Sequence, residues 1–243
     1  MVIGWRPARS TACSKSSEPK SFKKKSRNMN PILRLVEDVF SDGAVMTLAA
    51  EPRMIFVLHG AISVAGVSAI DGETWQGDGA ARIVAGPGGA MCWRYELSQS
   101  GGDDVVIANG VASRTRLAAP LEYLPAGDLL LRGDSVAFPP GGVAYLHRHQ
   151  GPGIRCLIEG GIRIDTHGRS TSYGPGGAWF ESGPEPVFAQ AALDRPSRFI
   201  RVMILPQALL GKSSIQYVNE EDKAKPKSQS YRVYADMPIV RRP

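Results

Sequence analysis

His147 and His149 are the residues of this sequence whose type and spacing best suit a chemical role. In an extended strand the side chains at positions i and i+2 point to the same face, so the two imidazoles would lie side by side. Neutral imidazole is the commonest metal ligand in proteins. The spacing therefore predicts two ligands for one metal ion, and the alternative is a pair of solvated histidines on a strand.

The residues around this pair resemble the first sequence motif of the cupin superfamily. That motif is a glycine, five residues, His-x-His, a short gap, a glutamate, six residues and a glycine. Here Gly141, His147, His149 and Gly160 match it. Cupins are small jelly-roll β-barrels, and many hold a divalent metal inside the barrel on three histidines and one glutamate. The resemblance thus implies a divalent metal cofactor, which would be Fe, Mn or Zn.

The sequence departs from the cupin pattern at two ligand positions. Gly153 stands at the glutamate position, and Val187 aligns with the third histidine, in the second motif. Glu181 lies where that second motif returns to the metal, so we expect it to supply the missing carboxylate unless it faces outward. Arg155 is two residues beyond Gly153 and is expected inside the barrel. Because an unpaired buried guanidinium is rare, it should pair with Glu181 or bind an anionic ligand.

The sequence also repeats itself at an offset of 100 residues. Residues 52–64 align with 152–164 without a gap, and each copy reads as a buried strand, a turn and an alternating strand. Residues 92–97 likewise match 199–204 as a closing strand. A period of this length indicates a duplicated domain.

We therefore predict an all-β protein of two tandem cupin-type barrels, a bicupin. The first barrel should span about 31–115 and the second about 120–206. At the offset of 100, Thr47 and Ala49 replace the histidine pair, so the first barrel has no metal motif. His59 and His167 are expected in solvated turns rather than as ligands.

Composition agrees with a β-rich globular protein. The hydrophobic share of 43% suffices for a packed core, while 27 glycines and 18 prolines indicate many tight turns between short strands. No apolar run reaches the roughly 18 residues of a membrane span, so no membrane partner is expected. Three widely spaced cysteines favour neither a disulfide framework nor a zinc knuckle, which makes the cytoplasm the expected location.

The positive charge is concentrated at the N-terminus. Residues 1–28 carry eight basic side chains and one acid, which gives this segment a net charge of +7. The net charge of the whole chain is +6, so the rest of the chain carries −1. A nearly neutral folded part argues against nucleic acid as a partner. The composition of 1–28 predicts a disordered extension. A transit peptide, a nucleic-acid arm and a dispensable upstream extension are the alternatives.

A C-terminal extension, 207–243, is expected to pack across a barrel or a neighbouring subunit, so a homodimer is possible.

Three functional hypotheses follow from the sequence. The protein is a metal-dependent oxygenase or isomerase acting on a small molecule, or it binds a small anion or sugar at Arg155 without chemistry, or it is a structural cupin with a decayed site. The sequence assigns no catalytic residue and leaves open whether the protein is an enzyme.

Overall fold

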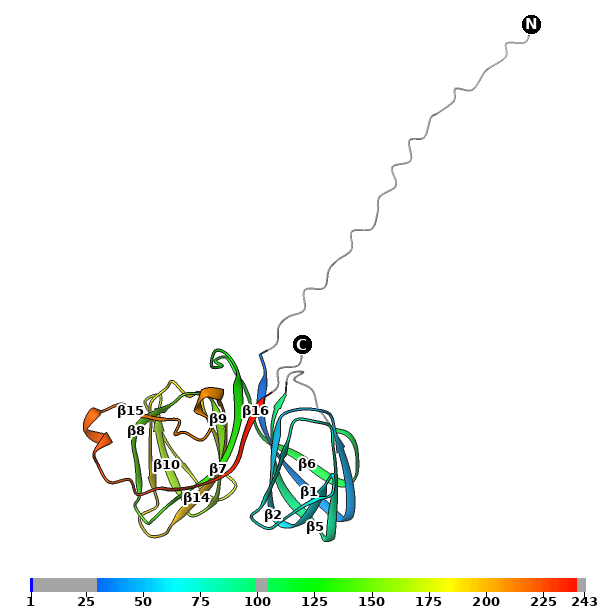
Figure 1. Ribbon diagram of the computed structural model, residues 1–243, viewed down its shortest axis with the longest axis horizontal. Helices are drawn as coiled ribbons and strands as arrows, with labels where there is room; N and C mark the ends of the chain where they lie inside the picture. The colour runs from blue at the N-terminus through cyan, green and yellow to red at the C-terminus, as the bar shows by residue number, and fades with distance from the viewer. Residues whose placement is uncertain (2–29, 99–104, 240–243) are drawn as a thin grey trace.

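The computed structural model describes Met1, residues 30–98 and residues 105–239 (Figure 1). The predicted N-terminal extension, 1–28, lies almost wholly outside these residues. Strands make up most of the described chain, and every strand pairing is antiparallel. The two short 3-10 helices found there, η1 (Gln207–Leu209) and η2 (Glu220–Lys223), are both near the C-terminus. Neither is long and apolar enough to span a membrane.

The first barrel is a single sheet in the order β3-β2-β5-β1-β6, with β4 paired to β2. Its long strands bend because the β1–β5 register shifts between Phe40 and Val45, next to Gly43 with a φ of 61°. This bend lets one sheet curl around its own core. The strands are β1 (Ile32–Leu48), β2 (Arg53–Val64), β3 (Val67–Ile70), β4 (Thr74–Gly77), β5 (Ala81–Ser98) and β6 (Val105–Pro120).

The second barrel consists of two facing sheets, in the orders β11-β10-β13-β8-β15 and β12-β9-β14-β7-β16. Both are completed by strands of the predicted C-terminal extension. The strands are β7 (Leu129–Phe138), β8 (Val143–His149), β9 (Gly153–Glu159), β10 (Ile162–Thr166), β11 (Arg169–Tyr173), β12 (Ala178–Glu181), β13 (Val187–Ala191), β14 (Ser197–Pro206), β15 (Ile215–Tyr217) and β16 (Ser230–Ile239).

The two barrels share one pairing pattern, as the sequence repeat predicts. The long strands of the first barrel correspond to pairs of shorter strands in the second: β1 to β7 and β8, β2 to β9 and β10, and β5 to β13 and β14. By the same pattern, β15 and β16 take the place that β6 takes beside β1. The extension is therefore an integral part of the second barrel.

Where the two barrels meet, side chains alternate along each strand. One set points into the strand's own barrel, and the other set packs against the neighbouring barrel. On β1, Leu33 and Leu35 belong to a buried apolar cluster that also contains Ile154 and Cys156 of β9. The Tyr95 hydroxyl crosses the same interface and donates a hydrogen bond to the Ile200 carbonyl at 3.2 Å. The intervening side chains, such as Arg155 on β9, point into their own barrel.

The interior of the first barrel contains a network of buried charges. Glu96, fully buried, accepts hydrogen bonds from Arg34, Arg53 and Arg94. Arg94 also binds the Asp38 carboxylate through two nitrogens, at 2.6 and 3.1 Å. Burial alone would raise the pKa of Glu96, but Arg94, Arg53 and Arg34 hold it below its ordinary value. Ion pairs therefore occupy part of the interior of the first barrel.

The two histidines outside the pair are exposed. His167 lies in the predicted turn, between β10 and β11, with a φ of 50°. His59 lies within β2 rather than in a turn, yet its side chain remains 80% exposed beside Asp71. Both histidines therefore serve as controls for experiments on the buried pair.

Candidate functional site

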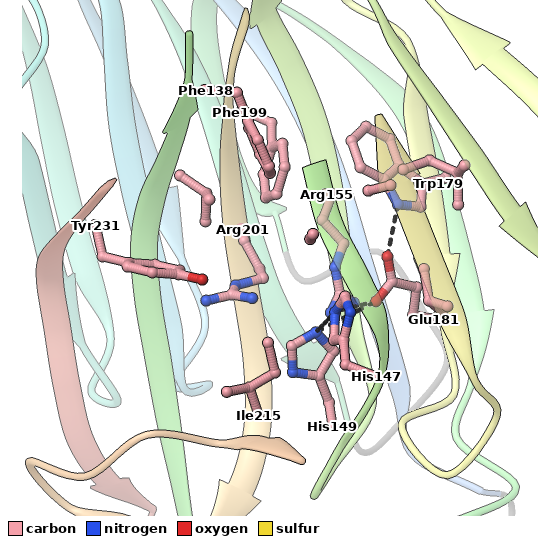
Figure 2. Close-up of a pocket in the computed structure, with 15 residues that line it drawn as sticks. Phe138, His147, His149, Arg155, Trp179, Glu181, Phe199, Arg201, Ile215 and Tyr231 are labelled. Carbon is pink, nitrogen blue, oxygen red and sulfur yellow. Dashed lines mark hydrogen bonds and ion pairs between the residues drawn. The ribbon is translucent and has the colours of Figure 1, made fainter. Parts of the chain in front are cut away.

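His147 and His149 lie on β8 and point together into the second barrel, as their spacing predicts (Figure 2). Each is only 5% exposed. Their Nε2 atoms are 3.2 Å apart, and the two rings meet edge to face. Arg148, between them in sequence, is exposed on the outer face. The strand therefore delivers both imidazoles to one point.

Hydrogen bonds set the tautomer of His147 and allow His149 the matching one. Nδ1 of His147 lies 2.7 Å from the Tyr145 carbonyl, which can only accept, so Nδ1 carries the proton and Nε2 presents a lone pair. Nδ1 of His149 lies 3.4 Å from the Ser214 hydroxyl, which can donate or accept. The proton of His149 can therefore reside on Nδ1, which leaves two Nε2 lone pairs facing one another, ready for a cation.

Burial lowers the pKa of both imidazoles. For His147 burial is the main cause, opposed by the charge of Glu181, and for His149 burial is reinforced by Arg155. Both rings are thus neutral at pH 7, and neutrality is the state that coordinates metal.

A pH-dependent stability follows for the metal-free protein. Because the folded-state pKa values lie below the unfolded value of about 6.5, the unfolded chain binds protons first as the pH falls. The stability that the neutral pair contributes is fully present above about pH 6.5 and is lost progressively as the pH falls below that value. We expect the melting temperature to fall between pH 7 and 5 in the wild type, and to fall less in the double variant His147→Gln, His149→Gln. An equal fall in both proteins would contradict neutral burial of the pair.

Glu181 faces inward and takes the position that Gly153 leaves without a side chain. The two residues are direct partners in the β12–β9 ladder. A Cβ at Gly153 would lie 2.6 Å from the Val202 carbonyl oxygen and 2.7 Å from Cγ of Met203, so a glutamate does not fit there. The Glu181 carboxylate is 7% exposed, and its Oε1 accepts a hydrogen bond from Trp179 Nε1 at 2.9 Å.

Arg155 pairs with this carboxylate, which was one of the two alternatives predicted for it. Its Nη2 lies 2.7 Å from Oε2 of Glu181, and its Nη1 donates to the Gly153 carbonyl at 2.7 Å. Complete burial lowers the pKa of Arg155 to about 10, while Glu181 acts to raise it. The guanidinium thus remains charged at pH 7, and it neutralises Glu181.

A second buried ion pair adjoins the histidines and was not predicted. Arg201 on β14 binds the Asp134 carboxylate on β7 through Nε at 2.9 Å and Nη2 at 2.7 Å. The Tyr231 ring lies beside the guanidinium, with its centroid 5.9 Å from Cζ. The sequence repeat aligns Arg201 with Arg94, which also binds an aspartate, Asp38. This alignment was the one feature of the sequence that could have pointed to the Arg201–Asp134 pair.

These groups line a small chamber of about 20 Å³. A cavity needs about 10–15 Å³ to hold one water molecule, so the chamber has room for a water or a single ion. Val187, aligned with the missing third histidine, lies directly opposite His147 on β13 and lines the chamber. Aromatic side chains, including Phe138, Trp179 and Phe199, form the wall away from the histidines.

The donor atoms fit a shared ion in part. Two nitrogens that each ligate a metal at about 2.1 Å can be no more than about 4.2 Å apart, and the observed 3.2 Å satisfies this limit. Oε2 of Glu181 lies 3.6 Å from Nε2 of His149, also within the limit, but it is engaged by Arg155. In residues 30–98 and 105–239, no three His, Cys, Asp or Glu side chains form a complete metal-binding group. The structure therefore brings together two free imidazole donors and one carboxylate that is already paired.

Similarity to known proteins is found at the level of structure. No protein-family model and no curated protein sequence matches the chain. A single-substitution variant of oxalate decarboxylase from Bacillus subtilis matches with a TM-score of 0.60 and 12% identity, over 82% of this chain and 74% of that one. The same enzyme at pH 4.6 matches with a TM-score of 0.57 and 13% identity, over 82% and 73%.

A further structure of this decarboxylase, from a study of its Mn(II) centres, gives a TM-score of 0.58 at 13% identity, over 82% and 74%. At such low identity the similarity concerns the fold and not the activity. Together with the duplicated strand pattern, it shows that the chain has the two-barrel fold of the bicupins.

Proposed function

We propose that the second barrel binds a divalent transition-metal ion (Fe, Mn or Zn) through His147 and His149, with Glu181 as the third protein ligand, and that the protein acts on a small molecule there. The observation that carries this proposal is the convergence of two buried, neutral imidazoles with Nε2 atoms 3.2 Å apart. Two nitrogen lone pairs at this distance repel one another unless a proton or a cation lies between them.

The residues around the pair have distinct roles in this proposal. The Tyr145 carbonyl fixes the tautomer and orientation of His147, and the Ser214 hydroxyl orients the ring of His149. Trp179 and Arg155 hold the carboxylate of Glu181 beside the chamber. The aromatic wall excludes bulk water, which strengthens electrostatic interactions inside.

The donor set also indicates a class of chemistry. Two histidines and one carboxylate suit Fe(II) or Mn and leave coordination positions open, so a bound ion would supply Lewis-acid or redox chemistry. A metal-dependent oxygenase or isomerase is the proposed class. The shared fold with a decarboxylase studied for its Mn(II) centres supports metal chemistry in this barrel but identifies no substrate.

Replacement of either buried histidine tests the proposal. We expect His147→Ala and His149→Ala each to weaken the binding of Mn(II) or Zn(II) by at least about tenfold, since each removes one of two nitrogen ligands. Binding would be measured by calorimetric titration of metal-free protein. His59→Ala and His167→Ala, on exposed side chains, should leave the affinity unchanged. Equal loss in all four variants, or in none, would refute the proposed ligands.

A second candidate function is the binding of a small anion or sugar without a metal. The Arg155–Glu181 pair favours it, because the guanidinium already supplies the positive charge that a metal would bring to this carboxylate. The same titration separates the two functions. A protein that binds neither Mn(II) nor Zn(II), yet is stabilised by small carboxylates or sugars, would have this second function.

A further inference from the structure

A larger pocket adjoins the metal chamber on the side of the C-terminal strands. Its volume is about 390 Å³, within the range of small-molecule sites. Four residues line both cavities, so the two spaces share one wall: His149, Arg201, Ile215 and Tyr231. By contrast, the chamber of about 20 Å³ is too small for any organic molecule. A ligand that reaches the histidines must therefore have most of its volume in this outer pocket.

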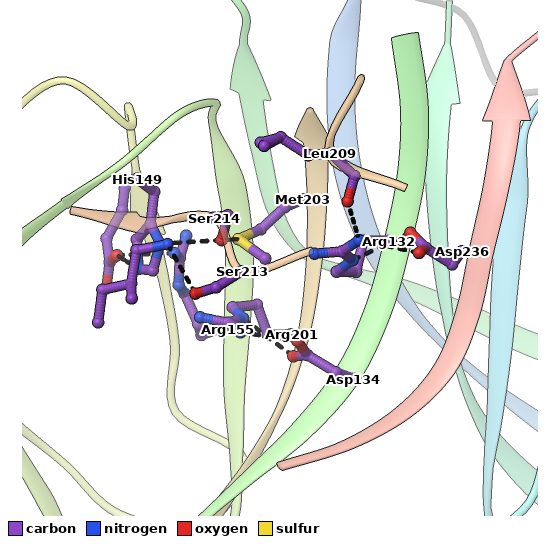
Figure 3. Close-up of polar contacts among 12 residues, drawn as sticks. Arg132, Asp134, His149, Arg155, Arg201, Met203, Leu209, Ser213, Ser214 and Asp236 are labelled. Carbon is purple, nitrogen blue, oxygen red and sulfur yellow. Dashed lines mark hydrogen bonds and ion pairs between the residues drawn. The ribbon is translucent and has the colours of Figure 1, made fainter. Parts of the chain in front are cut away.

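The segment after β14 builds the outer wall of this pocket, and the ion pair between Arg132 and Asp236, with hydrogen bonds to the backbone, fixes that wall in place (Figure 3). Arg132 binds Asp236 of β16 at 2.9 and 2.8 Å and donates to the carbonyls of Leu209 and Lys212. Asp236 in turn accepts a hydrogen bond from the Gly211 amide at 2.8 Å. The pocket is thus preorganised by residues 209–236, the strands that complete the second barrel.

Apart from the exposed Lys212 of the outer pocket, the charges around both cavities cancel in pairs. Arg132 is paired with Asp236, Arg201 with Asp134 and Arg155 with Glu181, and the histidines are uncharged. A divalent ion bound to the histidines would therefore bring a double positive charge that no further described carboxylate around the two cavities offsets. A buried charge without a partner is costly. The remaining ligand of such an ion should accordingly be an anion.

The lining of the outer pocket is mostly apolar. Ile215, the ring of Tyr231 and Val233 contribute its hydrocarbon surface, and Ser213 and Ser214 contribute hydroxyl groups. Val233 is 56% exposed and Tyr231 51% exposed, so both present apolar surface to the solvent at this pocket. A small hydrophilic anion would leave this surface in water.

We propose that the outer pocket binds the hydrocarbon part of an amphipathic organic anion, a carboxylate with an apolar body, whose charged group points to His149 and Arg201. This inference rests on the proposed metal site and specifies its ligand. Ile215, Tyr231 and Val233 are the residues that select for the apolar body, and they belong to the strands after residue 206. The C-terminal segment thus determines specificity.

A chain-length series tests this inference. The full-length protein would first be titrated with Mn(II) alone, and the loaded protein then with acetate, butyrate, hexanoate and hexan-1-ol by calorimetry. We expect affinity to rise by about tenfold for each added pair of methylene groups, because each enters apolar surroundings. Hexan-1-ol, which has the chain without the charge, should bind at least about tenfold more weakly than hexanoate.

Val233→Asn provides the matched variant, with Val67→Asn as its control. Val67 is 57% exposed on β3 of the first barrel, so both changes alter equally accessible valines. Val233→Asn should reduce hexanoate affinity by about threefold to tenfold and leave acetate and Mn(II) affinity unchanged, while Val67→Asn changes none of them.

The outcomes separate the two proposals. Mn(II) binding with no preference for hexanoate over acetate would overturn the ligand assignment and leave the metal site intact. Equal affinity for hexanoate and hexan-1-ol would overturn the requirement for an anion. Failure to bind Mn(II) or another divalent metal would overturn the metal site and, with it, this inference.

Discussion

Glu96→Gln should destabilise the protein by roughly 3–5 kcal/mol, the cost of removing one partner from a buried ion network. The carboxylate accepts hydrogen bonds from Arg34, Arg53 and Arg94, and Arg53 and Glu96 are fully buried. Glutamine keeps the shape but loses the negative charge, so it leaves excess positive charge in the interior of the first barrel. The measurement is the free energy of unfolding from urea denaturation followed by far-UV circular dichroism.

The matched control is Glu122→Gln, because Glu122 is an exposed residue in the connection between β6 and β7. A surface change of this kind usually alters stability by no more than about 0.5 kcal/mol. If Glu96→Gln were as mild as the control, the network would have to be hydrated, and the interior of the first barrel would differ from the structure described.

Arg155→Met is expected to have the second large effect, with opposite signs for folding and for metal binding. Without its partner, the buried Glu181 carboxylate keeps only the hydrogen bond from Trp179, so the metal-free protein should lose several kcal/mol of stability. The same change frees Oε2 for coordination and removes a positive charge close to the ion. Affinity for Mn(II) should therefore rise by at least about tenfold.

Arg148→Met is the control for this variant, because Arg148 lies between the two histidines but points outward. It should alter neither stability nor metal affinity appreciably. Unchanged or weaker Mn(II) binding by Arg155→Met would show that Glu181 is not a ligand. The Arg155–Glu181 ion pair would then occupy the site without a metal, as in the second candidate function.

Much of the fold could be predicted from the sequence, because its signals are local. Alternation within strands depends only on neighbouring residues, and the repeat at an offset of 100 revealed the duplicated barrel. The inward direction of His147 and His149 followed from the same alternation. The place of β15 and β16 could not be predicted in this way, because a three-residue strand and a distant edge strand carry little periodicity of their own.

The candidate site was predictable only where it lies within the recognised motif. Glu181 and Arg155 were identified as candidates, but their pairing depends on the β12–β9 register, which places Glu181 opposite Gly153. Asp134 and Arg201 meet across the β7–β14 ladder, 67 residues apart. Tyr231 reaches the chamber only because β16 returns beside β7. Contacts between strands that are distant in sequence require the topology to be known first.

The metal content of the wild-type protein tests the central claim most directly. The protein would be purified without a histidine tag and without chelators, and analysed by elemental mass spectrometry before and after incubation with Fe(II), Mn(II) or Zn(II). The proposed site predicts about one equivalent of metal per chain, together with a rise in melting temperature on loading. Less than about a tenth of an equivalent of any transition metal, with no rise in melting temperature on addition of any of the three, would contradict it.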